Sequence, residues 1–207
     1  MREHLAELPL VAILRGITPD EAVPVGLVLA EAGFRIIEVP LNSPQPLTSI
    51  ERLARELGTR CLVGAGTVMS ASQVDAVAQA GGRLIVMPHG DAAVIRAAKA
   101  HGLTCAPGIA TPAEGFAALA AGADALKLFP AELLTPPVLK ALRAVFPGDT
   151  LFLPVGGITP HNLAAYAAAG ASGFGLGSAL DKPGLTVEQV RANAAAFVAA
   201  WRETVIV

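Results

Sequence analysis

The chain has 207 residues, of which 53% are hydrophobic and 15% are charged, and its formal net charge is −2. Because this length is ordinary for one domain, we expect a single domain over residues 1–207. The nearly balanced charge lacks the basic excess typical of nucleic-acid binding, so we expect no nucleic-acid partner. The apolar share is high for a monomer and favours an oligomer that buries additional surface.

The pattern of apolar residues disfavours both membrane insertion and secretion. No apolar stretch of about 18 residues, the length that crosses a bilayer, runs free of charged residues, proline and glycine. Residues 1–5 lack the hydrophobic region of a signal peptide, so we expect a cytoplasmic protein with no membrane partner. Cys61 and Cys105 are isolated in apolar runs, which indicates reduced core residues and neither a disulfide nor a metal pair.

Short apolar runs alternate with helical patterns along the whole chain. The expected strands are residues 10–14, 35–39, 61–64, 84–87, 104–106, 125–129, 151–155 and 173–176. The expected helices are residues 19–32, 46–57, 71–80, 92–100, 112–120, 137–145, 160–168 and 187–201, with a short N-terminal helix at 2–7. Several helices open with a threonine before proline, at Thr18, Thr111 and Thr159, and end at Ala-Gly, which suits helix caps. Eight such units without a linker predict an α/β protein with a (β/α)8 TIM-barrel fold, and a doubly wound open sheet is the alternative.

Lys127 carries an ammonium group inside an apolar run, residues 125–130, that indicates a buried parallel strand stopped by proline. Burial lowers the pKa of a lysine, and a neutral amine can attack a carbonyl carbon. The alternative is a lysine at a strand end that pairs with a carboxylate or extends to solvent. The sequence around Lys127 leaves both interpretations open.

In a barrel, catalytic groups lie at the C-terminal ends of the strands. Glu38 lies in an apolar strand, where burial would raise its pKa and suit it to proton transfer. Its alternative is a buried ion pair with Lys127 or Arg15. Arg15 follows the first strand and could bind a carboxylate through two parallel hydrogen bonds, or be a surface loop residue.

Glycine-rich turns follow three of the expected strands. Thr67 comes after Gly-Ala-Gly and could bind an anion through its hydroxyl and amide, or cap the next helix. Two further turns follow the seventh and eighth strands, where barrels often bind phosphate through backbone N–H groups and a helix N-terminus. They contain Gly156, Gly157, Gly177 and Ser178. Here the helix expected from Pro160, or a short turn after Ser178, would add its dipole.

The histidines give no sign of a metal site. His4, His89, His101 and His161 show no ligand spacing and no joining carboxylate cluster, so we expect no catalytic metal. His89 lies near the expected active rim and could support other site residues. Phe129 could form an apolar wall that helps to keep the lysine amine neutral.

These motifs together resemble the class I 2-keto-3-deoxy-6-phosphogluconate/2-keto-3-deoxy-6-phosphogalactonate aldolases, which include the 4-hydroxy-2-oxoglutarate aldolases. The resemblance covers about residues 9–200, and as a set its motifs are highly specific. It implies a (β/α)8 barrel, usually a homotrimer, that uses a lysine Schiff base and no metal or other cofactor. The matching segments are VAILRG at 11–16, IEV at 37–39, GAGTV at 64–68, LKLFPAE at 126–132, GGI at 156–158 and GLGSAL at 175–180.

The resemblance also implies a role for each site residue. Lys127 would form the imine with the substrate C2 carbonyl, and Glu38 would shuttle protons and accept the C4 hydroxyl proton as the C3–C4 bond breaks. Arg15 and Thr67 would hold the carboxylate, and the products would be pyruvate and glyceraldehyde 3-phosphate. The phosphate would be held by Gly156, Gly157, Gly177 and Ser178, and the pocket wall would include Pro88, Phe129 and Val155.

The chain departs from the phosphogluconate type in two places. That type has Thr-Leu-Arg-Thr after the Glu-Val pair, where this chain has Pro-Leu-Asn-Ser at 40–43, and threonine before the paired glycines, where this chain has Val155. Both departures resemble the phosphogalactonate enzymes, whereas Met-Pro-His at 87–89 and Leu-Lys-Leu-Phe at 126–129 also resemble the phosphogluconate enzymes. The preferred C4 epimer therefore stays open, because one lost hydroxyl can change such a preference.

Two other functions remain as alternatives on the same barrel. A phosphosugar isomerase would use paired acid and base residues and would not need a neutral lysine. A phosphometabolite-binding protein would keep the glycine turns but tolerate the loss of Lys127. In each case the expected partner is a small phosphorylated molecule, for the aldolase a 2-keto-3-deoxy sugar acid phosphate.

Overall fold

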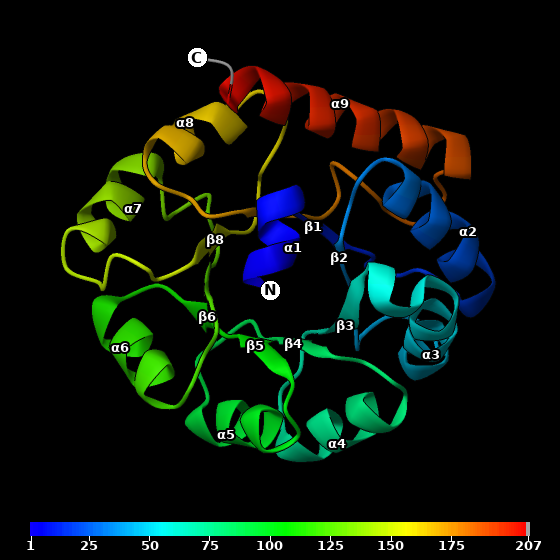
Figure 1. Ribbon diagram of the computed structural model, residues 1–207, viewed down its shortest axis with the longest axis horizontal. Helices are drawn as coiled ribbons and strands as arrows, with labels where there is room; N and C mark the ends of the chain where they lie inside the picture. Colours follow the sequence, from blue (N-terminus) through cyan, green and yellow to red (C-terminus); the bar gives the residue numbers. More distant parts are fainter. Residues whose placement is uncertain (206–207) are drawn as a thin grey trace.

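The computed structural model describes residues 1–205 and has an α/β architecture in which all paired strands are parallel. Its strands are β1 (Leu10–Ile13), β2 (Ile36–Pro40), β3 (Leu62–Gly66), β4 (Leu84–Val86), β5 (Thr104–Ala106), β6 (Gly108–Ile109), β7 (Leu126–Leu128), β8 (Phe152–Pro154) and β9 (Phe174–Leu176). Its helices are α1 (Arg2–Glu7), α2 (Pro19–Glu31), α3 (Pro46–Leu57), α4 (Ala71–Gln79), α5 (Ala92–Ala100), α6 (Pro112–Ala120), α7 (Pro136–Arg143), α8 (Leu163–Ala168) and α9 (Val187–Val205), with a 3₁₀ turn at Gly58–Arg60. Helices α2 to α9 form a ring around the strands (Figure 1).

The strands form a six-stranded sheet, in the order β5-β4-β3-β2-β1-β9, and a three-stranded sheet, β6-β7-β8. Pro107 alone separates β5 from β6, and proline lacks the N–H that a continuous ladder needs. A parallel bridge joins Val155, just after β8, to Gly175 in β9. The α/β class with a curled parallel sheet is confirmed. The division into two sheets was not expected from the sequence.

The strands separate an outer apolar core, against the helices, from an inner one. Leu5 of α1 belongs to the inner core, and a Cβ at Gly173 would lie only 2.8 Å from its side chain. Helix α1 therefore packs across the N-terminal ends of the strands, over the centre of the ring (Figure 1). The inner core contains residues from strands of both sheets, so the two sheets enclose one common interior. Its buried residues are Leu5, Val11, Ile36, Leu62, Leu84, Val86, Ala106, Ala125 and Leu153.

Most expected elements are confirmed to within a few residues, and the helix expected at 160–168 is present but starts later than expected. Helix α8 begins only at Leu163. Asn162 accepts a hydrogen bond from Thr159 N (2.9 Å) and donates one to Gly157 O (2.8 Å), which holds residues 157–162 in a turn. The expected cap at Thr159 is therefore wrong.

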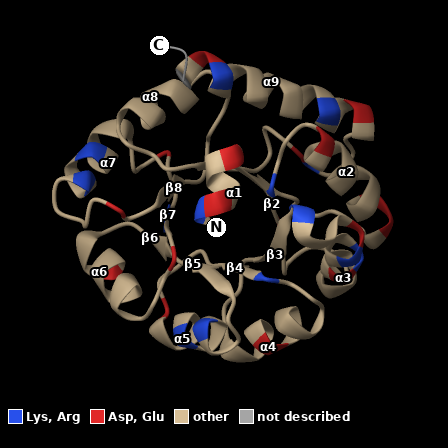
Figure 2. Ribbon diagram, viewed as in Figure 1, with Lys and Arg blue, Asp and Glu red and all other residues tan. Residues whose placement is uncertain are grey.

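Charged residues are excluded from almost all of the strands. Figure 2 shows most lysine, arginine, aspartate and glutamate residues on the surrounding helices, their loops and α1. Within the described strands, Glu38 in β2 and Lys127 in β7 are the only charged residues. None of the helices described between residues 1 and 205 has the length and apolar character required to span a bilayer.

Candidate active site

Lys127 and Glu38 come from different sheets and share the interior between them. Lys127 is paired with Gly108 of β6 and Leu153 of β8, and Glu38 with Ile13 of β1 and with β3. Lys127 is only 6% exposed and Glu38 only 2%. The charge of each side chain shifts the pKa of the other, so the fold brings the two together, as the sequence predicted.

The Glu38 carboxyl group is buried without a compensating partner. Its Oε2 has no hydrogen-bond partner among residues 1–205, and none of the ion pairs found there includes Glu38. A Cβ at Gly66 would collide with this carboxyl group, so only glycine leaves it room. Burial raises the pKa of Glu38 to about 7, against the opposing charges of Lys127 and Arg15. The buried ion pair considered as its alternative is not among the ion pairs found within residues 1–205.

Burial lowers the pKa of Lys127, which favours the neutral amine. The nearby charge of Glu38 raises this pKa, and that of Arg15 lowers it further. Nζ lies 4.7 Å from the centre of the Phe129 ring, whose π face favours the ammonium form. Phe129 thus lies beside the amine, as expected, but its ring face opposes the effect of burial on the amine instead of adding to it.

Arg15 lies at the rim beyond β1 and is held by neighbouring loops. Its Nη1 donates a 2.7 Å hydrogen bond to Asn42 Oδ1, and its Nη2 makes a longer contact, 3.5 Å, with Thr67 Oγ1. Thr67 has a left-handed backbone with φ of 56°. Thr67 does not cap the next helix, because Ser70 caps α4 by accepting a bond from Gln73 N. The structure therefore brings Arg15 and Thr67 together and leaves the Thr67 hydroxyl at the rim.

The two glycine turns have different surroundings. Gly156 and Gly157 have φ of 107° and 64°, and a Cβ at Gly157 would lie 2.8 Å from the Glu132 side chain. The positive φ angles at Gly156 and Gly157 are enough to require glycine at both positions, whether or not they bind a ligand. At Gly177, by contrast, no heavy atom of the described residues other than Gly177 and its two chain neighbours lies within 4 Å of a Cβ position. A short turn follows it, closed by the N–H groups of Leu180 and Asp181 on Gly177 O.

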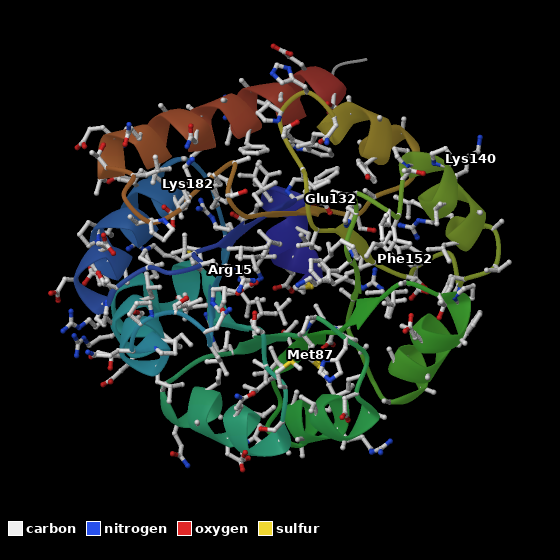
Figure 3. All side chains as sticks on the ribbon, turned by 180° about the vertical axis from the view of Figure 1, so that it is seen from behind. Arg15, Met87, Glu132, Lys140, Phe152 and Lys182 are labelled. Atoms are coloured by element: carbon white, nitrogen blue, oxygen red, sulfur yellow. The ribbon has the colours of Figure 1, made fainter. Side chains whose placement is uncertain are left out.

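The expected contribution of a helix near Pro160 to this region is wrong, because α8 starts at Leu163. The structure has the expected short turn around Ser178, closed by the bonds to Gly177 O, and its contribution to phosphate binding stays a prediction. Figure 3 views the molecule from behind Figure 1, on the face opposite α1. Arg15 and Glu132 lie inside the ring of helices on this face, whereas Lys140 points outward from α7.

The remaining expected wall residues lie near the interior. Pro88 follows β4, and its carbonyl packs so closely on β6 that a Cβ at Gly108 would collide with it. Val155 is 8% exposed, and its backbone bonds to Leu128 and Ala131 on the lysine-bearing side. His89 Nδ1 is buried without a hydrogen-bond partner among the described residues. No group of three or more metal-binding side chains is found within residues 1–205.

Three residues near the site were not singled out from the sequence. Asn42 binds Arg15, Ser43 Oγ accepts a 2.9 Å bond from Gly16 N, and Glu132 lies against the paired glycines. Asn42 and Ser43 stood out only as departures from the phosphogluconate pattern. Glu132 lies at the end of the matching segment LKLFPAE at 126–132, but the sequence pattern predicted no role for it.

Comparison with known proteins identifies the family. The family model described as "Aldolase: KDPG and KHG aldolase" matches residues 1–194. The chain belongs to this KDPG and KHG aldolase family. The resemblance drawn from the motifs is confirmed, and with it the expectation of a carbon–carbon lyase.

Two curated members of this aldolase family match the chain over most of its length. The 2-dehydro-3-deoxy-6-phosphogalactonate aldolase of Escherichia coli strain K12 is 52% identical over 96% of this chain and 97% of its own. The 2-dehydro-3-deoxy-phosphogluconate aldolase of Treponema pallidum is 32% identical over 80% of this chain and 77% of its own. The chain is thus more similar to the galactonate enzyme than to the gluconate enzyme.

Several solved structures are similar to this chain. "Native KDPGal structure" has a TM-score of 0.95 and 50% identity over 97% of this chain and 98% of that one. A protein cage "designed by fusing symmetric oligomeric domains" has the same TM-score and identity, and covers 97% of this chain and 74% of that one. The KDPG aldolase of Legionella pneumophila "with pyruvate captured at low pH as a covalent carbinolamine intermediate" has a TM-score of 0.82 and 26% identity, over 96% and 95%.

Proposed function

We propose that this aldolase cleaves 2-dehydro-3-deoxy-6-phosphogalactonate to pyruvate and glyceraldehyde 3-phosphate through an imine on Lys127. The observation that carries the proposal is a buried lysine with a lowered pKa beside a buried, unpaired Glu38 whose pKa is about 7. A neutral amine and a nearby base are what Schiff-base cleavage requires. The carbinolamine in the Legionella relative supports the same covalent chemistry. We place the reaction in the cytoplasm, and activity on 4-hydroxy-2-oxoglutarate is part of the proposal.

The two buried residues divide the chemistry between them. Lys127 Nζ adds to the C2 carbonyl, and the hydroxyl of the resulting carbinolamine takes a proton relayed by Glu38 and leaves as water, which gives a protonated imine. Glu38 then takes the C4 hydroxyl proton, the C3–C4 bond breaks, and its electron pair moves into the imine. This releases the aldehyde and leaves an enamine of pyruvate. Protonation at C3 and hydrolysis of the imine release pyruvate and restore the Lys127 amine.

The rim residues would hold the two charged ends of the substrate. Arg15 and the Thr67 hydroxyl bind the carboxylate, since a guanidinium matches a carboxylate in charge and shape. The phosphate binds at Gly177 and Ser178, where the structure leaves space, together with the turn at Gly156 and Gly157. Binding the ends in this way fixes the C3–C4 bond beside Glu38.

The galactonate epimer is the proposed physiological substrate. Val155, 8% exposed and near the lysine strand, offers no hydrogen-bonding side chain to the C4 hydroxyl. The 52% identity to a galactonate enzyme, against 32% to a gluconate enzyme, supports the same choice. A site that pairs a substrate hydroxyl discriminates against the epimer in which that hydroxyl stays unpaired.

We also propose that the two sheets form one (β/α)8 barrel. The Val155–Gly175 bridge links β8 to β9, and Pro107 alone interrupts the chain between β5 and β6. The shared inner core supports this closure. In such a barrel the rim described above is the usual place for catalysis.

Steady-state cleavage assays test the substrate proposal. We expect a higher kcat/KM for the phosphogalactonate than for its phosphogluconate epimer, and a lower value for 4-hydroxy-2-oxoglutarate, which lacks the phosphate. Gly177→Ala should raise the KM for phosphorylated substrate by about 10-fold or more, because the added methyl displaces the phosphate from charge-assisted hydrogen bonds. It should leave the unphosphorylated substrate nearly unchanged.

Gly148→Ala is the matched control for that assay. Apart from Gly148 and its two chain neighbours, no heavy atom of the described residues lies within 4 Å of a Cβ at Gly148, and Gly148 lies outside the proposed site. Equal loss on all substrates in Gly177→Ala would count against the phosphate site. Gly157 is a poorer test, because its φ of 64° and the Glu132 contact make any side chain disruptive.

We propose a homotrimer with closed cyclic symmetry. Large apolar side chains are exposed on one copy, including Leu133 (74%), Val145 (58%) and Phe116 (46%), and Phe116 stacks on Phe146 at 4.3 Å. The similar cage chain, which was designed by fusing symmetric oligomeric domains, supports an assembly of this kind. Light scattering at micromolar concentration should give three times the 21.0 kDa chain mass, and the mass of one chain would refute the proposal.

A further inference from the structure

Asn42 stands out because it is exposed yet makes a short contact with Arg15. No packing requirement fixes an exposed asparagine in a loop. Nevertheless, its Oδ1 accepts a 2.7 Å hydrogen bond from Arg15 Nη1, across 27 positions of sequence. Hydrogen bonds to charged groups are among the stronger ones in proteins.

Backbone hydrogen bonds hold the residues on both sides of Asn42 in its loop. Leu41 N donates to Gly66 O (2.8 Å), and Ser43 N donates to Pro40 O (2.9 Å). Ser43 is buried, and its Oγ accepts from Gly16 N, the residue after Arg15. Asn42 and Ser43 of the loop after β2 thus form hydrogen bonds with the two consecutive residues Arg15 and Gly16 of the loop after β1. Asn42 is therefore held on a fixed support and does not simply follow Arg15.

We infer that Asn42 is a positioning residue, which holds the Arg15 guanidinium by one nitrogen so that its other N–H groups face the carboxylate of the 2-keto acid. This inference rests on the proposed function, in which Arg15 binds that carboxylate. Arginine loses considerable rotamer freedom when it is fixed, and a fixed partner removes that loss from the binding step.

The chemistry of the amide explains why asparagine suits this position. Its oxygen orients the guanidinium but carries no charge, so the positive charge of Arg15 stays available to the substrate. An aspartate would hold Arg15 at least as firmly, but it would neutralise the guanidinium and repel the incoming carboxylate. A hydrophobic residue would leave Arg15 free to move.

Pyruvate trapping on Lys127 gives the direct test. The protein is incubated with increasing pyruvate and borohydride, and the mass added at Lys127 is followed. Asn42→Ala should raise the pyruvate concentration for half-maximal trapping by about 10-fold, the scale of one hydrogen bond to a charged group. The trapping rate at saturating pyruvate should change little, because Asn42 acts on binding and does not touch the reacting atoms.

A double-mutant cycle with Arg15→Gln separates positioning from any direct role. Without Arg15, Asn42→Ala should cause no further loss, since its effect passes through the guanidinium. An equal loss in both backgrounds would overturn the inference. Asn42→Asp should also raise the half-maximal concentration, and behaviour like that of the unaltered protein would likewise count against it.

Glu31→Ala serves as the matched control. Glu31 accepts a 2.9 Å bond from Arg191, so its removal frees another exposed arginine far from the rim, and trapping should not change. If the unaltered protein shows no mass at Lys127, the proposed function itself fails. If it traps normally and Asn42→Ala has the same half-maximal concentration, only the role of Asn42 is refuted.

Discussion

Lys127→Met should abolish aldol cleavage while the protein stays folded. Removing a covalent nucleophile lowers kcat by roughly 10⁴-fold or more, because the remaining groups cannot form the imine. The fold should tolerate the change, since methionine fills similar volume and removes a charge from a strand where Lys127 is 6% exposed. We therefore expect an unchanged or higher Tm together with lost activity.

The measurement combines kinetics with mass spectrometry after pyruvate and borohydride treatment. In the unaltered chain the added mass should appear on Lys127 and not on Lys99, Lys140 or Lys182. Lys140→Met and Lys182→Met are suitable controls, because both side chains are exposed and Lys140 points away from the ring (Figure 3). Mass on another lysine, or near-normal turnover in Lys127→Met, would refute the proposed imine.

The same experiment distinguishes the alternative functions. A phosphosugar isomerase on this barrel forms no imine, so borohydride would add nothing to Lys127. A phosphometabolite-binding protein would keep its ligand affinity in Lys127→Met. Only the aldolase loses both trapping and turnover through this one change.

The two central residues could be predicted because their signal is local. A charged residue in an apolar strand stands out in the sequence, and Lys127 and Glu38 are the only charged residues in the described strands. The order of strands and helices followed from the same alternation of patterns. The expected caps held where threonine precedes proline at Thr111, whose Oγ1 accepts from Glu114 N.

What could not be predicted depends on contacts between distant segments. The Arg15–Asn42 bond joins loops after β1 and β2, and no spacing rule predicts which side chains meet there. Asn162 delays the start of α8 through bonds to Thr159 and Gly157 that compete with a helical turn. The break at Pro107 has a local cause, but proline can also end a strand, which is how the sequence pattern was interpreted.

Glu38→Gln should lower turnover by about 10²- to 10⁴-fold, the usual range for a lost general acid or base. Glutamine keeps the shape that fits against Gly66 but cannot take the C4 hydroxyl proton. The charge of Glu38 raises the pKa of Lys127, so its removal should lower that pKa further and keep the amine neutral. Pyruvate should therefore still be trapped on Lys127, which separates this variant from Lys127→Met. Near-normal turnover would assign Glu38 a structural role.

The pH dependence of cleavage gives Glu38 a second, independent test. Burial raises its pKa to about 7, and proton abstraction needs the ionised form, so kcat/KM should fall as the pH drops below about 7. Burial also raises the pKa of Asp181, to about 6, so Asp181→Asn is the control that should keep this limb. The residual activity of Glu38→Gln should not show this fall in kcat/KM at low pH.

The same shift makes a prediction about stability. Glu38 has a higher pKa in the folded chain than its usual 4.5, so between these values the folded state binds more protons than the unfolded state. The unaltered protein should therefore lose stability as the pH rises from about 4.5 to 7, whereas Glu38→Gln lacks this loss. The Tm difference between the two proteins, measured at pH 5 and pH 8, should move in favour of the variant at the higher pH. A difference that does not vary with pH would mean that Glu38 stays ionised in the folded protein at both pH values, stabilised as a carboxylate by Lys127 and Arg15.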